Sequence, residues 1–171
     1  MPYRSIVISS GHGLHVRGAA GIVDEVDEAR KVTECVAEKL RKRGVTVHVF
    51  HDDTSKDQST NLSTIVNYHN SKTRDLDVSV HFNAFEQTSD PQGVEVLYVT
   101  QDMLADKISA AIAACGFTDR GSKKHTGLYF LNETDMPSVL LEVCFVDSEA
   151  DCELYAQQFD KICTAIADAL V

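Results

Sequence analysis

The stretch from residue 5 to residue 13, SIVISSGHG, is a run of β-branched residues that ends in a glycine-flanked histidine. The Ile-Val-Ile segment is typical of a strand buried on both faces, as in a sheet covered by helices. The two glycines beside His12 allow a sharp turn and leave the imidazole unobstructed. Catalytic groups of α/β folds are commonly carried at such strand ends. Taken alone, a Gly-His-Gly loop is also typical of a solvated surface histidine, so the rest of the chain must decide.

Strand-like and helical stretches alternate along the rest of the chain. Asp24 is typical of a helix N-cap. Acidic residues follow it in the first turn and basic residues precede Gly44 in the last turn, so a helix is expected between Asp24 and Gly44. Strands are expected at 45–50, 76–84, 93–99, 128–131 and 138–144, helices at 62–71, 103–115 and 148–170 (the last with a break near its start), and a polar loop at 119–126. This alternation predicts a single α/β domain, residues 1–171, with a largely parallel sheet.

Composition excludes several classes of partner. The 26 acidic and 16 basic residues give a net charge of −10, which argues against nucleic acid or an anionic membrane as the main partner. No apolar run approaches the ~18 residues that span a bilayer, so no membrane insertion is expected. The five cysteines are irregularly spaced and form no C-x-x-C pair, which predicts buried free thiols in a reducing compartment.

Three polar residues interrupt apolar strands or their ends, namely His12, His81 and Glu142. Equivalent ends of parallel strands meet at one rim of a sheet, and the acidic helix start at 24–28 can face the same rim. Two histidines and a carboxylate suit zinc and leave a fourth position for water. A further buried carboxylate beside that water would be the general base.

Each of these residues also has a structural interpretation. His81 is equally consistent with a hydrogen-bonded core histidine, and the acids at 24–28 with charges that favour a helix N-terminus. Glu142 is consistent with a structural ion pair, although an unpaired buried carboxylate costs several kcal/mol. The combination, rather than any one residue, favours a metal site.

Several segments together resemble the zinc N-acetylmuramoyl-L-alanine amidases of the amidase-3 type, found in bacterial autolysins, sporulation hydrolases and phage endolysins. The matching segments span nearly the whole chain and lie in the family's order. They are ISSGHG at 8–13, Glu25 nineteen residues before Gly44, VSVHFNA at 78–84, DRG at 119–121, GLYFL at 127–131 and PSVLLEVCF at 137–145.

The resemblance implies that His12, Glu25 and His81 bind Zn²⁺ and that Glu142 is the catalytic carboxylate. It also implies a twisted sheet of about six strands flanked by helices. The residues alone leave the choice among the acids at 24–28 open; the family's spacing to Gly44 selects Glu25. The chain departs from the family at His51-Asp52, where arginine-aspartate is usual, and at Ile65, where arginine is common.

The implied reaction is hydrolysis of the amide between the lactyl group of muramic acid and L-alanine in peptidoglycan, which would lyse the cell wall. Alternatives are a zinc peptidase or other amidase on the same scaffold, and a wall-binding module without turnover. Cys144, two residues past Glu142, is expected on the same strand face as a small buried hydrophobe. We expect a monomer that acts at the bacterial wall, with a separate wall-binding domain as a possible partner. The start of the chain lacks signal-peptide features, consistent with cytoplasmic synthesis and later release, as in a phage lysin, or with a domain excised from a secreted protein.

Overall fold

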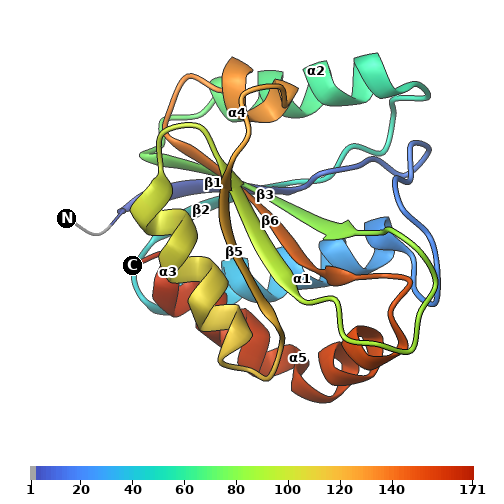
Figure 1. The fold of residues 1–171 in the computed structure, drawn as a ribbon. Helices are drawn as coiled ribbons and strands as arrows, with labels where there is room; N and C mark the ends of the chain where they lie inside the picture. Colours follow the sequence, from blue (N-terminus) through green and yellow to red (C-terminus); the bar gives the residue numbers. More distant parts are fainter. Residues whose placement is uncertain (1–2) are drawn as a thin grey trace.

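One six-stranded sheet organises the chain, and its strands lie in the order β2-β1-β3-β6-β4-β5 (Figure 1). The computed structural model describes residues 3–171; residues 1–2, which belong to the segment considered above for a signal peptide, lie outside it. The strands are β1 (Ser5–Ser10), β2 (Thr46–Phe50), β3 (Leu76–Asn83), β4 (Val94–Tyr98), β5 (Asp119–Lys124) and β6 (Ser138–Phe145). The helices are α1 (Glu25–Lys42), α2 (Gln58–Asn70), α3 (Asp102–Ala113), α4 (Tyr129–Glu133) and α5 (Glu149–Ala169).

Four neighbouring strands of the sheet, β2, β1, β3 and β6, run parallel to one another. β4 pairs antiparallel with β6, and β5 pairs parallel with β4, so the last two strands run in the opposite direction. The prediction of a single α/β domain with a twisted, mostly parallel sheet of about six strands is therefore confirmed. The parallel arrangement brings the carboxyl ends of β1, β3 and β6 to one rim.

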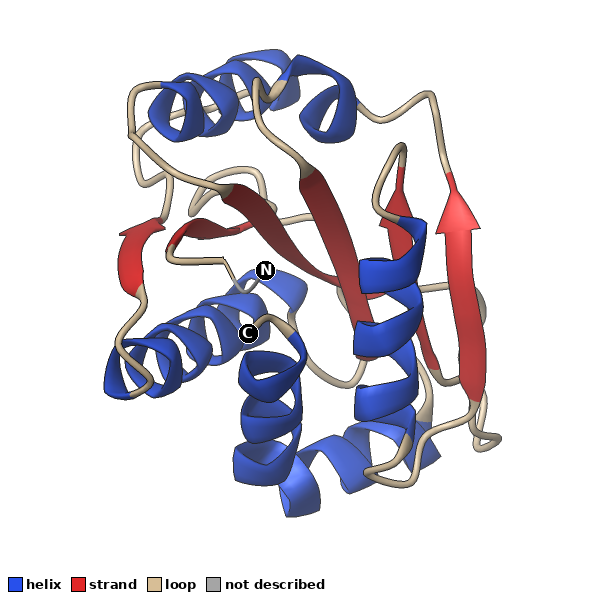
Figure 2. Cartoon of the chain, turned by 90° about the vertical axis from the view of Figure 1, so that its left-hand side faces the viewer, coloured by secondary structure: helices blue, strands red, loops and turns tan. Residues whose placement is uncertain are grey.

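Helices cover both faces of the sheet (Figures 1 and 2). α1, α3 and α5 pack on one face, where their apolar residues join those of the strands in the main core. α2 and α4 lie on the other face over a smaller apolar cluster that includes Ile65, Phe130 and Leu140. Burial on both faces explains why the sequence of β1 contains a continuous apolar run.

α1 begins where its sequence predicts. The side chain of Asp24 accepts hydrogen bonds from the backbone N–H groups of Val26 at 3.0 Å and Asp27 at 3.3 Å, which satisfies two donors that a helix start leaves open. The Arg17 guanidinium holds the same carboxylate at 2.8 Å. This cap fixes the first helical residue, Glu25, against the rim of the sheet.

Two segments have a different secondary structure from the one expected. Residues 119–124 form the edge strand β5 rather than a loop, and residues 129–133 form the short helix α4 rather than a strand. An edge strand is commonly charged because one side of it faces solvent, so DRGSKK carries no apolar alternation to detect. The short run at 128–131 has too few residues to distinguish a strand from a helical turn. α2 also begins earlier than expected, at Gln58 behind its Asp57 cap, and α5 is unbroken.

The described cysteines are free thiols, and all but Cys35 are buried. The expectation that Cys144 shares the face of Glu142 is wrong. The pairing of β3 with β6 shifts register between His81 and Asn83, and this irregularity turns Cys144 into the main core. Among residues 3–171, the helices are too short or too polar to cross a bilayer.

Candidate metal centre and active site

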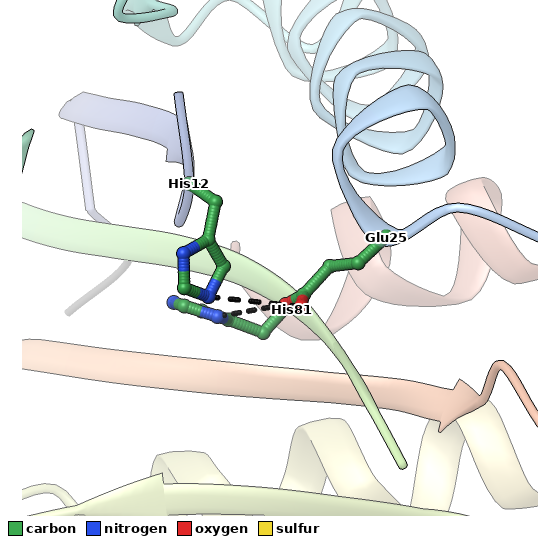
Figure 3. A group of neighbouring side chains, drawn as sticks. All are labelled: His12, Glu25 and His81. Atoms are coloured by element: carbon green, nitrogen blue, oxygen red, sulfur yellow. Dashed lines mark hydrogen bonds and ion pairs between the residues drawn. The ribbon is translucent and has the colours of Figure 1, made fainter. Parts of the chain in front are cut away.

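Three segments far apart in the sequence bring His12, Glu25 and His81 together (Figure 3). His12 lies in the loop after β1, Glu25 is the first residue of α1, and His81 lies near the end of β3. One nitrogen of each imidazole and one carboxylate oxygen lie within 4.8 Å of one another. The structure thus places the three sequence-predicted ligand residues in one cluster, and the selection of Glu25 from the acidic turn agrees with this geometry.

Glu25 lies at the centre of the cluster. Its Oε1 is 3.0 Å from Nδ1 of His81, and its Oε2 is 3.6 Å from Nε2 of His12. The backbone N–H groups of Ala19 and Phe82 donate to the same carboxylate at 2.6 and 3.1 Å. Four groups from two segments, β3 and the loop before α1, surround this carboxylate, and they fix the orientation of a side chain that is only 4% exposed.

The absence of a side chain at Gly11 makes room for His81. A Cβ atom at this position would lie 1.8 Å from Nε2 of His81 and 2.0 Å from its Cε1. No adjustment of a few tenths of an ångström relieves such an overlap. The glycine before His12 is therefore required by the close approach of the His81 ring to the backbone at this position, and the rings of His12 and His81 have centroids 5.0 Å apart.

The electrostatics of the cluster favour a charged carboxylate beside a neutral His12. Burial and the neighbouring His81 lower the pKa of His12 against the opposing charge of Glu25. Burial alone would raise the pKa of Glu25, but its hydrogen bond to His81 and the charges of both histidines lower it. Burial would likewise lower the pKa of His81, but the hydrogen bond to Glu25 and the charges of Glu142 and Glu25 raise it.

Glu142 lies beside His81 on the neighbouring strand, because the two residues are paired in the β3–β6 register. Its Oε2 is buried and has no hydrogen-bond partner among the described residues. Burial, with the nearby charges of Glu25 and Glu95, raises the pKa of Glu142 to about 7 despite the opposing effect of His81. The structural ion pair considered for this residue is absent from residues 3–171.

A hollow of about 400 Å³ opens above His81 and Glu142. Its floor is formed by β3 and β6, and its walls by α2 and by the turn that leads into α4. Besides His12, His81 and Glu142, the lining includes Gln58, Leu62, Ile65, Ser79, Leu97, Leu128, Tyr129, Phe130 and Leu140. The wall from α4 was not predicted, because its residues were expected in a strand.

The residues of the cluster suit a divalent metal. Two imidazole nitrogens and one carboxylate are a common ligand set for zinc with an open coordination position. Nδ1 of His12 is buried without a hydrogen-bond partner among the described residues, and so is Oε2 of Glu142. Buried polar atoms without partners cost about 1–3 kcal/mol each, so both atoms are available to a bound ion or water.

A second buried histidine network lies beneath the site and was not predicted. His69 of α2 contacts Oδ1 of Asp77 at 2.8 Å through Nδ1 and Oγ of Ser9 at 2.9 Å through Nε2. Arg74 pairs with Asp77 at 2.9 Å. The order of groups resembles a serine hydrolase relay, but Ser9, His69 and Asp77 are fully buried, so substrate does not reach the hydroxyl. The network instead fixes α2 to β1 and β3.

Comparison with known proteins gives concordant results. The model of the family described as N-acetylmuramoyl-L-alanine amidase (Amidase_3) matches residues 6–171. The chain is 32% identical over 160 residues to a 38.4 kDa protein of Clostridium perfringens, covering 90% of this chain and 46% of that protein. It is 32% identical over 177 residues to the N-acetylmuramoyl-L-alanine amidase LytC of Bacillus subtilis, covering 98% of this chain and 35% of LytC.

Solved structures show the same fold. The catalytic domain of the CD27L endolysin, which targets Clostridia difficile, superposes with a TM-score of 0.90 at 27% identity, covering 98% of this chain and 96% of that domain. The two folds therefore match over nearly their whole length. This chain spans about half or less of the length of the two sequence relatives.

Proposed function

This chain belongs to the N-acetylmuramoyl-L-alanine amidase family, and from that membership we propose that it hydrolyses the amide between the lactyl group of muramic acid and L-alanine in peptidoglycan. The observation that carries the proposal is the cluster of His12, Glu25 and His81 beside the unpartnered carboxylate of Glu142. The similarity to LytC and to an endolysin catalytic domain supports the same reaction.

The ion that fits the cluster is zinc, held by one nitrogen of His12, one nitrogen of His81 and the carboxylate of Glu25. When bound, zinc supplies a Lewis acid that polarises the scissile carbonyl and makes water more acidic. The backbone N–H groups of Ala19 and Phe82 keep Glu25 oriented toward the histidines. Such outer contacts fix the direction of a ligand and help set metal affinity.

Glu142 acts as the general base and then as the general acid. Its buried oxygen has no protein partner among the described residues and lines the hollow, so it is available to take the proton of the attacking water. It then gives that proton to the departing nitrogen of L-alanine, since a neutral amide nitrogen leaves poorly without protonation. The carbon–nitrogen bond breaks, and the products are the lactyl carboxylate and the free amine of the peptide.

The site of action is the bacterial cell wall, where peptidoglycan is found, and cleavage there would lyse the wall. Proteins related to this chain extend well beyond the segment that it matches. A separate wall-binding domain is therefore proposed as the partner that brings the catalytic domain to the wall. We propose that the domain itself is a monomer.

Two variants test the division of roles. Glu142→Gln should keep the fold and one equivalent of zinc but lose at least ~10²-fold of the activity on peptidoglycan, because the amide neither takes nor gives the proton. His81→Ala should lose zinc as well as activity. Near wild-type hydrolysis by Glu142→Gln would refute its role, loss of zinc from that variant would make Glu142 a ligand, and a full equivalent of zinc in His81→Ala would refute the ligand set.

A further inference from the structure

A bulge in the edge strand β5 gathers two cations beside the active site. Val94 pairs with Asp119 but Val96 pairs with Ser122, so β5 contains one extra residue at this point. Gly121 has a φ of 76°, a conformation that side chains rarely adopt, and it permits the bulge. In a regular strand, residues three apart point to opposite faces. The bulge allows both Arg120 and Lys123 to reach the same carboxylate, that of Glu95.

Arg120, Lys123 and Glu95, here called the cationic group, together carry a net positive charge. Arg120 Nε donates to Oε2 of Glu95 at 3.0 Å, and the ammonium of Lys123 pairs with the same oxygen. Two cations thus face one carboxylate. Nη1 of Arg120 donates to the carbonyl oxygen of Gln92 at 3.4 Å, and no acceptor within residues 3–171 takes the hydrogens of Nη2. The group therefore has one positive charge and one pair of donors to offer a ligand.

This cationic group lies one strand away from Glu142. Glu95 and Glu142 are directly opposite in the β4–β6 register, so about 4.8 Å separates their strands. The amide of Asn83, two residues after His81, donates to Oε1 of Glu95 at 3.2 Å and ties the group to the end of β3. Arg120 is thus connected through Glu95 to the strands that carry His81 and Glu142.

A second hollow, of about 370 Å³, lies at Arg120 and is here called the Arg120 hollow. It is lined by Asn83, Ala84, Phe85, Gln92, Arg120 and Phe145. The guanidinium lies 5.0 Å from the centre of the Phe145 ring, which holds its plane in place, and the Arg120 side chain is 35% exposed. On β3 and β6 the lining residues of this hollow, at 83–85 and 145, follow those of the hollow above His81 and Glu142, at 79–81 and 140–142.

We propose that the Arg120 hollow binds the peptide side of the substrate, and that Nη2 of Arg120 binds the free carboxylate of the residue after L-alanine. The proposal rests on the proposed amidase function. The glycan is uncharged at the scissile bond, because the lactyl carboxylate is consumed in the amide. The next peptide residue, a glutamate linked through its side-chain carboxyl, keeps its α-carboxylate. Consecutive Cα atoms are ~3.8 Å apart, so this carboxylate lies within a few ångströms of L-alanine, on the scale of the strand spacing between Glu142 and Glu95, whose Oε2 the Arg120 guanidinium contacts.

A binding measurement tests the proposed peptide subsite independently of the proposed amidase activity. The probe is the tripeptide L-alanyl-γ-D-glutamyl-L-lysine, compared with the same peptide amidated at the glutamate α-carboxylate, titrated into the zinc-loaded protein and followed by NMR. The carboxylate form should bind about 10–100-fold more tightly than the amide form, as expected for a charge-assisted hydrogen bond. Arg120→Gln should remove that difference, and Arg120→Lys should restore part of it.

Lys124→Gln is the matched control, because it removes the same charge from the last residue of β5, which is exposed and lies outside the Arg120 hollow. It should change the preference less than about 2-fold, and melting temperatures should show that each variant is folded. In hydrolysis of the two forms of a peptidoglycan fragment, Arg120→Gln should raise KM for the carboxylate form and leave kcat nearly unchanged. Equal binding of the two tripeptides, or a preference that survives in Arg120→Gln, would overturn the subsite, whereas a peptidoglycan digest without amidase products would overturn the function.

Discussion

The most severe steric demand in the site is at Gly11, and it yields a quantitative prediction for Gly11→Ala. The added Cβ would lie 1.8 Å from Nε2 of His81, whereas non-bonded atoms approach comfortably at about 3.5 Å, so the ring must move by about 1.7 Å. Metal–ligand distances tolerate only about 0.2 Å. His81 lines the hollow of about 400 Å³, into which its ring can turn, so the chain should fold without its third ligand in place.

The expected result is a folded protein that binds zinc at least about 100-fold more weakly, since loss of a contact that merely orients a ligand already costs about 10–100-fold. Competition with a chromophoric chelator measures this affinity. Gly44→Ala is the control: Gly44 has a φ of 82°, so alanine there is strained by about 1–3 kcal/mol, but no atom lies within 4 Å of the added Cβ. That variant should lose stability and keep zinc. Zinc affinity in Gly11→Ala equal to that of the wild type would refute the proposed ligand geometry.

Three further predictions concern the metal, the core and the buried histidine. Chelation of zinc should abolish hydrolysis and lower the melting temperature, and zinc should restore both; activity that persists in chelator would exclude zinc dependence. Ile108→Ala, in the core between α3 and the sheet, should lower the free energy of unfolding by about 2–5 kcal/mol with zinc content unchanged, and a loss below about 1 kcal/mol would contradict the packing. Burial lowers the pKa of His69 by more than the hydrogen bond to Asp77 raises it, so folding favours the neutral imidazole. This contribution to stability is complete above the pKa of about 6.5 that histidine has in the unfolded chain. It falls as the pH decreases, by up to about 1.4 kcal/mol per pH unit. Denaturant titrations of the metal-free protein between pH 5 and 8 should show this dependence weakened in His69→Gln, and an identical slope in both proteins would contradict it.

The sequence predicts those parts of the fold in which the local environment of a residue determines which residue type is found there. The apolar run of β1 and the acidic start of α1 have that property, because burial on both faces and the helix dipole each select residue types locally. β5 does not, because Arg120 and Lys123 are determined by their charge partner Glu95 on another strand rather than by alternation within β5. The helical turn at 129–133 is likewise defined by packing against α2, which no local pattern reports.

The candidate site divides in the same way. His12, His81 and Glu142 stand out because polar residues at apolar strand ends are costly without a role. The choice of Glu25 from five consecutive residues came from the family's spacing, and its physical basis is three-dimensional: Ala19 and Phe82 direct their N–H groups at this carboxylate. The hydrogen-bond network of His69 is not predictable from the sequence, because its partners Ser9 and Asp77 lie on β1 and β3.

Mass spectrometry of peptidoglycan digested by the zinc-loaded protein tests the claim that this chain cuts the bond between muramic acid and L-alanine. We expect peptides with a new amino-terminal L-alanine and glycan strands with free lactyl carboxylates, both absent after digestion with Glu142→Gln. Cleavage within the peptide would instead indicate a zinc peptidase on this scaffold. Peptidoglycan that binds the protein but stays intact would indicate a wall-binding module, and either result would contradict the claim.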